Sequence, residues 1–274
     1  MSNRPVVTLA LAVIALALPG EARAAPENQI AISYSVDAGG LTMLKINYEA
    51  ALSAEAYRSA ASIKTKGLAG LFSAYQMDMS ASGSVSADDT IPARFASRAE
   101  KSDKQKTIEL RWQGDSAPEV KTTPPDPEDE ALIAGGLKPG LVDPLSMILR
   151  MTAFQADEPC RKSINVVDGH DVYRLSFTLE GKTKLSSDSP GAYRGPALKC
   201  SMTYVPLAGR AARKFKKNGS VPERFALWLA PVSAGNATAT WFFPVVATGK
   251  LQGMSFVAYA REVTLDGMPI AKAD

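Results

Sequence analysis

Residues 29–36 read Gln-Ile-Ala-Ile-Ser-Tyr-Ser-Val, with a large apolar side chain at every second position. A period of two places those apolar side chains on one face of an extended chain, which is typical of a β-strand with one buried face. Turn-forming residues follow at 37–40, and apolar and polar residues alternate again over 44–48. The two segments therefore predict a β-hairpin at the start of the fold.

Short segments of the same kind, bounded by turn residues, continue along the chain. The absence of long helical patterns between them favours an antiparallel sheet or barrel over a parallel α/β fold. A short apolar piece at 67–74 predicts one or two helical turns. The further predicted strands cover residues 57–65, 76–85, 93–102, 106–113, 119–122, 163–167, 172–179, 198–205, 224–230, 238–246, 253–260 and 262–265.

One helix is predicted to start at Asp143, whose side chain can cap it, with Pro144 in the first helical position. Side chains recur at helical spacing and should pack on the sheet; they are Leu141, Leu145, Ile148, Leu149 and Thr152. We therefore predict a mainly β protein, built as one antiparallel curved sheet or partly open β-barrel with one packed α-helix and a single disulfide.

Residues 124–130 read Pro-Pro-Asp-Pro-Glu-Asp-Glu, inside a segment without strand or helix periodicity that runs from 122 to 140. Prolines break regular structure and clustered acids prefer water, so this segment is expected to form a solvated acidic loop. A binding site for basic partners is the alternative.

The composition excludes several classes of protein. With 274 residues, 46% of them hydrophobic and 22% charged, the chain has the values of a folded soluble protein, which argues against disorder and a collagen-like repeat. Lys and Arg number 31 against 28 Asp and Glu, a balance that does not suit a protein built mainly to hold nucleic acid. One His and two Cys leave no four-cysteine zinc or iron–sulfur site. We predict no metal, no cofactor and no nucleic-acid partner.

The first 24 residues have the pattern of a secretory signal peptide. Arg4 supplies a positive start, and the apolar run over 6–18 is shorter than the roughly 20 residues that span a bilayer. Small residues at 22 and 24 form a cleavage signature, so we expect cleavage near Ala24. Residues 25–274 would then be a single β-rich domain of the periplasm without a transmembrane segment. An uncleaved membrane anchor is the alternative.

Cys160 and Cys200 are the only thiols, and an even count in an exported protein suggests a disulfide. The bridge would close a loop of about 40 residues, worth roughly 4 kcal/mol in the chain-entropy model. A redox or nucleophilic thiol is the alternative, although such thiols usually belong to a Cys-x-x-Cys pair or lie beside an activating base.

The late strands carry apolar residues on both faces, notably over 225–230 and 241–246. A sheet wetted on one side alternates instead, so both faces of these strands need cover. Core packing is one explanation. The other is a cavity for an apolar ligand, for which the candidate lining residues are Trp228, Trp241, Phe243, Leu145, Ile148 and Leu149.

A basic run follows the predicted strand over 198–205. Such a run can contact anionic head groups, each cation adding about 1 kcal/mol near a charged membrane surface. A solvated, solubilising turn is the alternative. The five cations are Arg210, Arg213, Lys214, Lys216 and Lys217.

His170 is the only histidine, so any mechanism with a histidine base must use it. It falls in a predicted hairpin turn between Asp168 and Asp171, where a solvated side chain is the simpler interpretation. The chain contains no Gly-x-Ser-x-Gly nucleophile motif. We therefore assign no catalytic residue.

Several pieces of the chain resemble the exported envelope proteins of the domain-of-unknown-function 3108 family. The matching pieces lie at 34–36, 40–41, 66–68, 92–95 and 143–146, and most distinctively at Cys160 with 166–169 and at Cys200 with 204–206. The resemblance implies an exported chain with a curved or barrel-like sheet. It also implies a distant similarity to lipoprotein-carrier folds, in which a half-open barrel with a helical lid holds acyl chains.

These observations favour a non-catalytic periplasmic protein of an uncharacterised family that binds or carries a hydrophobic envelope component, such as a lipid. Two alternatives stay open. One is an envelope-integrity protein that acts through contacts with another envelope protein. The other is a hydrolase that depends on His170.

Overall fold

The computed structural model describes residues 28–67, 74–86, 89–102, 104–152, 160–218, 223–232, 241–251 and 253–272. The expected signal peptide over residues 1–24 and most of the helical piece expected at 67–74 lie outside these residues. None of the helices within them has the length and apolar character needed to cross a membrane.

Fourteen strands of the described chain form one antiparallel sheet, which confirms the predicted fold class. Thirteen of them follow in the order β7-β6-β5-β4-β3-β2-β1-β13-β12-β11-β10-β9-β8, and β14 pairs with β13. The strands are β1 (Asn28–Ala38), β2 (Leu41–Leu52), β3 (Ala56–Thr65), β4 (Tyr75–Ser86), β5 (Asp89–Lys101), β6 (Lys104–Arg111), β7 (Glu119–Thr123), β8 (Ser163–Val167), β9 (Asp171–Leu185), β10 (Gly195–Gly209), β11 (Glu223–Val232), β12 (Trp241–Leu251), β13 (Met254–Leu265) and β14 (Met268–Lys272).

The strand order describes two meanders joined by one long-range pairing. Within β1–β7 and within β8–β13 each strand pairs with its neighbour in sequence. The join is made by β1 and β13, where Ile30 lies opposite Leu265. The ends of the sheet, β7 and β8, are not neighbours in this order, so the barrel stays open along that side.

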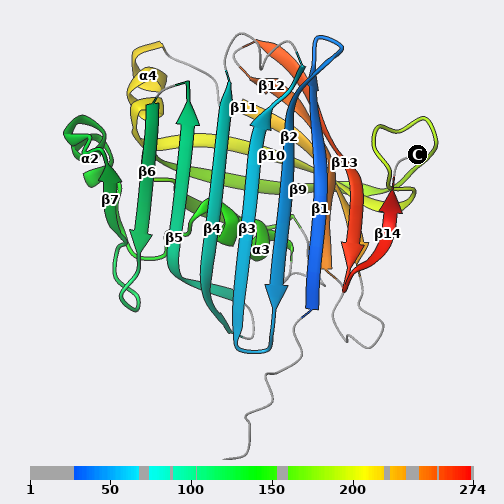
Figure 1. The fold of residues 1–274 in the computed structure, drawn as a ribbon, viewed down its shortest axis with the longest axis horizontal. Coiled ribbons are helices and arrows are strands. Elements are labelled where there is room, and N and C mark those ends of the chain that lie inside the picture. The colour runs from blue at the N-terminus through cyan, green and yellow to red at the C-terminus, as the bar shows by residue number, and fades with distance from the viewer. Residues whose placement is uncertain are drawn as a thin grey trace, which may run out of the picture.

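The sheet curves around a helix (Figure 1). Strands β1–β6 stand side by side at the front of the view, β9, β10 and β11 cross behind them in another direction, and α3 (Pro144–Thr152) lies between the two walls. This helix contacts β3, β4 and β5 of the front wall and β8 and β12 of the rear part. The predicted packing of this helix on the sheet is therefore confirmed, and the helix is inside the barrel.

The buried residues fall into two core clusters. The first core cluster takes Leu145 and Leu149 of α3 together with the inward residues of the front wall, such as Ile30 and Ile32, which are 1% and 2% exposed. The second core cluster takes Met151 of α3 together with residues of β8–β11. The helix thus contributes apolar side chains to both clusters, which ties the two walls together.

The start of α3 follows the sequence prediction. The Asp143 carboxylate accepts hydrogen bonds from the backbone N–H groups of Leu145 and Ser146, both at 2.9 Å, as a helix cap does. Pro144 occupies the first helical position, where no N–H donor is needed.

The expected solvated loop over 122–140 is wrong in its middle part, where α2 (Pro127–Ala134) forms. Asp126 caps this helix by accepting from the backbone N–H of Asp129, and Pro127 stands in its first turn. Asp129 is only 1% exposed. The run of prolines and acids therefore marks the start of a helix. The described residues contain three short helices, α2, α3 and α4 (Arg210–Asn218), of which α3 is the packed helix that was predicted.

The disulfide between Cys160 and Cys200 is confirmed, with the two Cα atoms 6.1 Å apart. Both residues are buried in the second core cluster. The bridge joins the chain that follows α3 to β10, so it anchors the region of the helix to the rear wall.

Candidate functional site

All six residues proposed to line an apolar cavity belong to the first core cluster or pack against it. Phe243, Leu145 and Leu149 are fully buried, whereas the other three are partly buried at its margin; these are Ile148, Trp228 and Trp241. Trp241 and Phe243 stack edge to face with ring centroids 6.1 Å apart. The interior at these positions is occupied by the protein's own side chains.

Both faces of β11 are covered, as its sequence requires. Leu227 and Leu229 are buried in the second core cluster, while Trp228 packs against the first. Trp228 lies opposite Lys199 of β10, whose ammonium group is 5.7 Å from the indole centroid. The indole is therefore covered in part by a cation–π contact.

A buried chain of hydrogen bonds seats α3 on the front wall. The Ser146 hydroxyl donates to the Asp143 carboxylate, and the Tyr57 hydroxyl of β3 lies 2.6 Å from the Ser146 oxygen. Because the Ser146 proton is directed at Asp143, Tyr57 is the donor in its bond to Ser146. Asp143 and Ser146 are 0% exposed and Tyr57 is 1% exposed. This chain of hydrogen bonds is inaccessible to a substrate, and its role is to position α3.

Burial controls the ionisation of the Asp143 carboxyl and the Tyr57 phenol in this chain of hydrogen bonds. Loss of solvation raises the pKa of the Asp143 carboxyl to about 6, even though the Ser146 hydroxyl and the two backbone N–H groups stabilise its charged form. Burial also raises the pKa of the Tyr57 phenol, with the nearby Asp143 carboxylate adding to the effect. Burial therefore makes the charged form of both groups less favourable than it is in water.

A cluster of charged side chains surrounds α2 near the open side of the barrel, and we call it the α2 clasp. Asp129 accepts from His170 Nδ1 at 2.6 Å and from Lys106 Nζ at 3.3 Å, and it is ion-paired with Arg210. Lys106 also donates to Asp126 at 2.9 Å. The clasp joins β6 of the front wall, the turn between β8 and β9, and α4.

The partners of Asp126 and Asp129 in the α2 clasp shift the pKa values of these two carboxyl groups. The hydrogen bond from Lys106 lowers the pKa of Asp126 to about 2. Burial opposes ionisation of Asp129, but the hydrogen bonds from His170 and Lys106 outweigh it and lower the pKa of that carboxyl. Both groups are therefore charged at neutral pH.

The structure divides the basic run that sequence reasoning treated as one surface. Arg210 is bound to Asp126 and Asp129, and Arg213 lies 2.9 Å from Glu128. The remaining cations are exposed on α4 and have no ion-pair partner in the described part of the chain; they are Lys214, Lys216 and Lys217. Three of the five cations thus remain available to an anionic surface.

His170 belongs to the α2 clasp, where its Nδ1 atom meets the Asp129 carboxylate. Among the described residues, no hydroxyl or thiol group hydrogen-bonds its ring. No group of three or more His, Cys, Asp or Glu side chains suited to a metal ion occurs there either. His170 therefore has the geometry of a structural residue that holds the turn between β8 and β9 against α2.

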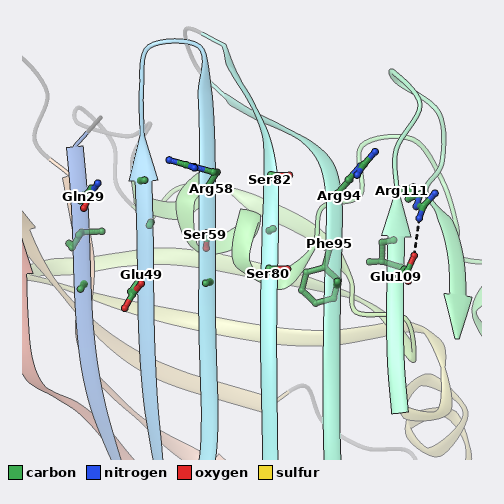
Figure 2. A pocket seen from close by; sticks show the side chains of 18 of the residues that line it. Gln29, Glu49, Arg58, Ser59, Ser80, Ser82, Arg94, Phe95, Glu109 and Arg111 are labelled. Atoms are coloured by element: carbon green, nitrogen blue, oxygen red, sulfur yellow. Dashed lines mark hydrogen bonds and ion pairs between the residues drawn. The ribbon is translucent and has the colours of Figure 1, made fainter. Parts of the chain in front are cut away.

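A groove of about 840 Å³ crosses the outer face of strands β1–β6, on the side away from α3 (Figure 2). Small side chains form its floor: Ala31, Ala51, Ala60, Ser80, Ser82 and Ala96. Charged side chains stand around them: Glu49, Arg58, Arg94, Glu109 and Arg111. None of the six residues predicted to line an apolar cavity is among them.

Sequence reasoning did not find this groove. The signal was present in the outward positions of the predicted strands, where small and charged residues take turns with the buried ones, as in Arg58 and Ala60 on β3. Periodicity identifies which residues face outward, but only the strand register shows which of them meet across six strands.

Comparison with known proteins identifies a family for the chain. The family model described as "Protein of unknown function (DUF3108)" matches residues 33–250, which is most of the chain.

The chain belongs to the DUF3108 family.

No curated protein matches this DUF3108 chain. Among solved structures it is similar to the β-barrel-like protein of domain of unknown function DUF1849 from Brucella abortus. The two are 11% identical, and the match covers 87% of this chain and 97% of the other with a TM-score of 0.45.

Proposed function

We propose that this DUF3108 protein is a non-catalytic binding protein of the periplasm that holds an apolar envelope component, such as a lipid chain, inside its open barrel. The supporting observation is the position of α3 between two apolar walls. Leu145 and Leu149 fill the first core cluster, and Met151 the second. An apolar chain that displaced these side chains would supply the two walls with apolar contacts in place of those that they lose.

The open side of the barrel supports entry of such a ligand. No backbone ladder joins β7 to β8 in the described sheet. The two sides are held there by α2 and its charged clasp instead. Side-chain ion pairs separate more readily than a continuous strand ladder, because water solvates the separated charges.

Export to the periplasm is supported by the amino-terminal sequence and by the disulfide, which is typical of an oxidising compartment. The exposed lysines of α4, Lys214, Lys216 and Lys217, would bring the protein to anionic head groups.

Native mass spectrometry of the protein exported by its own host tests the proposal. We expect a bound mass that organic extraction releases as a lipid. The Tyr57→Phe variant loses the hydrogen bond that seats α3, so its ligand should exchange faster with added lipid. Tyr75→Phe, on β4, is the matched control, because no hydrogen bond of its hydroxyl is found in the described chain. An unliganded mass in several independent preparations would contradict the proposal.

A second candidate function, contact with another envelope protein, is favoured by β14. This short strand pairs with β13 along one edge, and its residues Met268 and Ile270 are 69% and 43% exposed. A partner strand can add to such an edge. Crosslinking from position 270 in cells should then capture one specific partner, whereas no crosslink would count against this function.

A further inference from the structure

The groove on the outer face holds a line of arginines that the core and the α2 clasp do not use. In the strand register Arg58 of β3 lies opposite Ser82 of β4, Ser82 lies opposite Arg94 of β5, and Arg94 lies opposite Arg111 of β6. Neighbouring strands are about 4.8 Å apart, so three guanidinium groups share a strip of about 15 Å.

The pair formed by Arg94 and Arg111 is unfavourable for the isolated protein. Like charges directly opposite each other on adjacent strands repel. Glu109 neutralises Arg111, since the two side chains form an ion pair with a hydrogen bond of 3.0 Å. Arg94 has no ion-pair partner among the described residues, and Figure 2 shows its side chain directed toward β6, where Arg111 lies. One guanidinium is therefore left uncompensated beside another.

The surroundings of this pair leave room for a ligand. Ser82 and Ala96 place a hydroxyl and a methyl group beside Arg94, so no large side chain covers the groove there. Guanidinium groups bind phosphate oxygens through two parallel hydrogen bonds, and a serine hydroxyl can donate a third. A phosphoryl group between Arg94 and Arg111 would remove their repulsion.

The rest of the groove is longer than a phosphate. It reaches from Gln29 on β1 to Arg111 on β6, about 24 Å across six strands. Its polar groups beyond the arginines are the Glu49 carboxylate, the Ser80 hydroxyl and the Gln29 amide, which suit hydroxyl groups of a ligand. A peptide would gain no strand pairing here, because each of the strands β1–β6 already pairs with a neighbouring strand on both sides.

We propose that the outer groove binds a soluble phosphorylated saccharide, with its phosphoryl group held by Arg94 and Arg111 and its sugar hydroxyls placed over Ser80 and Glu49. This site is separate from the barrel interior, since it lies on the opposite face of the front wall from α3.

Calorimetric titration of the mature, oxidised protein at low salt tests the assignment. The probes are glucose 1-phosphate, inorganic phosphate, a short polyglutamate peptide and phosphatidylglycerol vesicles. Glucose 1-phosphate should bind at one site per chain and more tightly than inorganic phosphate. Arg94→Gln should weaken this binding about tenfold or more, because a charge-assisted hydrogen-bonding partner is lost. Arg94→Lys keeps the positive charge but loses the paired N–H donors of the guanidinium group. Its affinity for glucose 1-phosphate should therefore lie between those of the wild type and Arg94→Gln.

Arg98→Gln is the matched control. Arg98 lies on the same strand and the same face as Arg94, but it is paired with Glu100 at 2.9 Å and does not line the groove. An equal loss of binding in both variants would show general attraction of anions and overturn the site. Tighter binding of the peptide, binding to vesicles alone, or no saturable binding of glucose 1-phosphate would overturn it as well.

Discussion

Asp143 is a carboxylic acid with no exposed surface at the start of a helix that lies inside the barrel. Its oxygen atoms accept three hydrogen bonds, two from backbone N–H groups and one from the Ser146 hydroxyl. These bonds stabilise the ionised form, yet loss of solvation dominates and the pKa rises to about 6. The residue that caps α3 therefore also makes the seating of α3 sensitive to pH.

The pH dependence of stability follows from this shift. A raised pKa means that the folded state binds the proton more tightly than the unfolded state, so stability falls as the pH rises from about 4 to about 6 and is constant above that range. The change attributable to Asp143 is about 3 kcal/mol. Asp143→Asn keeps an acceptor for the cap and should remove the change, as measured by urea unfolding at pH 4, 5, 6 and 7.

The exposed Asp115→Asn serves as the control for that series and should retain the wild-type profile. Asp126 acts in a different window, because its pKa is lowered to about 2 and its contribution is lost only as the pH falls below about 4. A profile for Asp143→Asn that declines between pH 4 and 6 as steeply as that of the wild type would contradict the assignment.

Gly169 is a second residue with a defined structural role, because its position in a turn leaves no room for a side chain. It lies in the turn between β8 and β9 with a φ of +92°, and a Cβ atom there would overlap the Ile108 side chain of β6. Gly169→Ala combines backbone strain with a steric clash and should destabilise the protein by about 2 kcal/mol or more.

Gly140→Ala separates the two effects on Gly169. Gly140 has a similar φ of +80°, but nothing lies within 4 Å of the added Cβ. Gly140→Ala should therefore show the backbone strain alone, and its loss of stability in thermal unfolding should be smaller than that of Gly169→Ala. Equal losses in the two variants would mean that the contact between the turn and β6 is unimportant.

At the scale of elements, α2 explains how an acidic, proline-rich segment becomes ordered. Pro127 suits a first helical turn, Asp126 caps it, and the buried Asp129 is surrounded by Lys106, His170 and Arg210. These partners come from β6, the turn after β8 and α4, which lie far apart in sequence. The helix therefore depends on tertiary partners that no local pattern reveals.

The α2 clasp should be sensitive to loss of its central acid. Asp129→Asn removes the buried countercharge of Lys106 and Arg210 and leaves them paired with Asp126 alone, which we expect to cost about 2 kcal/mol of stability. Glu128→Gln on the same helix breaks only the exposed pair with Arg213 and should cost less than about 1 kcal/mol. Guanidinium unfolding of both variants compares them directly, and similar small losses would show that the clasp contributes little.

At the scale of the whole molecule, local patterns predicted the parts that local physics decides. Alternation identified the strands, and Asp143 with Pro144 marked the start of α3. The disulfide followed from an even cysteine count in a chain with the pattern of a signal peptide. The division of the basic run and the outer groove could not be predicted, because they depend on which strands and helices meet. Arg94 and Arg111 become neighbours only through the register of β5 and β6.

The pairing of β1 with β13 has a consequence for biogenesis. The backbone N–H of Gln29 donates to the side chain of Asp266, 237 positions further along the chain. Among the described strands, the first to emerge from the ribosome must therefore wait for the last but one before both of its edges are occupied. Closing a loop of that size is slow. During this interval the nascent front wall exposes a strand edge that can pair with other chains, so a chaperone that shields that edge until β13 is available would raise the yield of the folded protein.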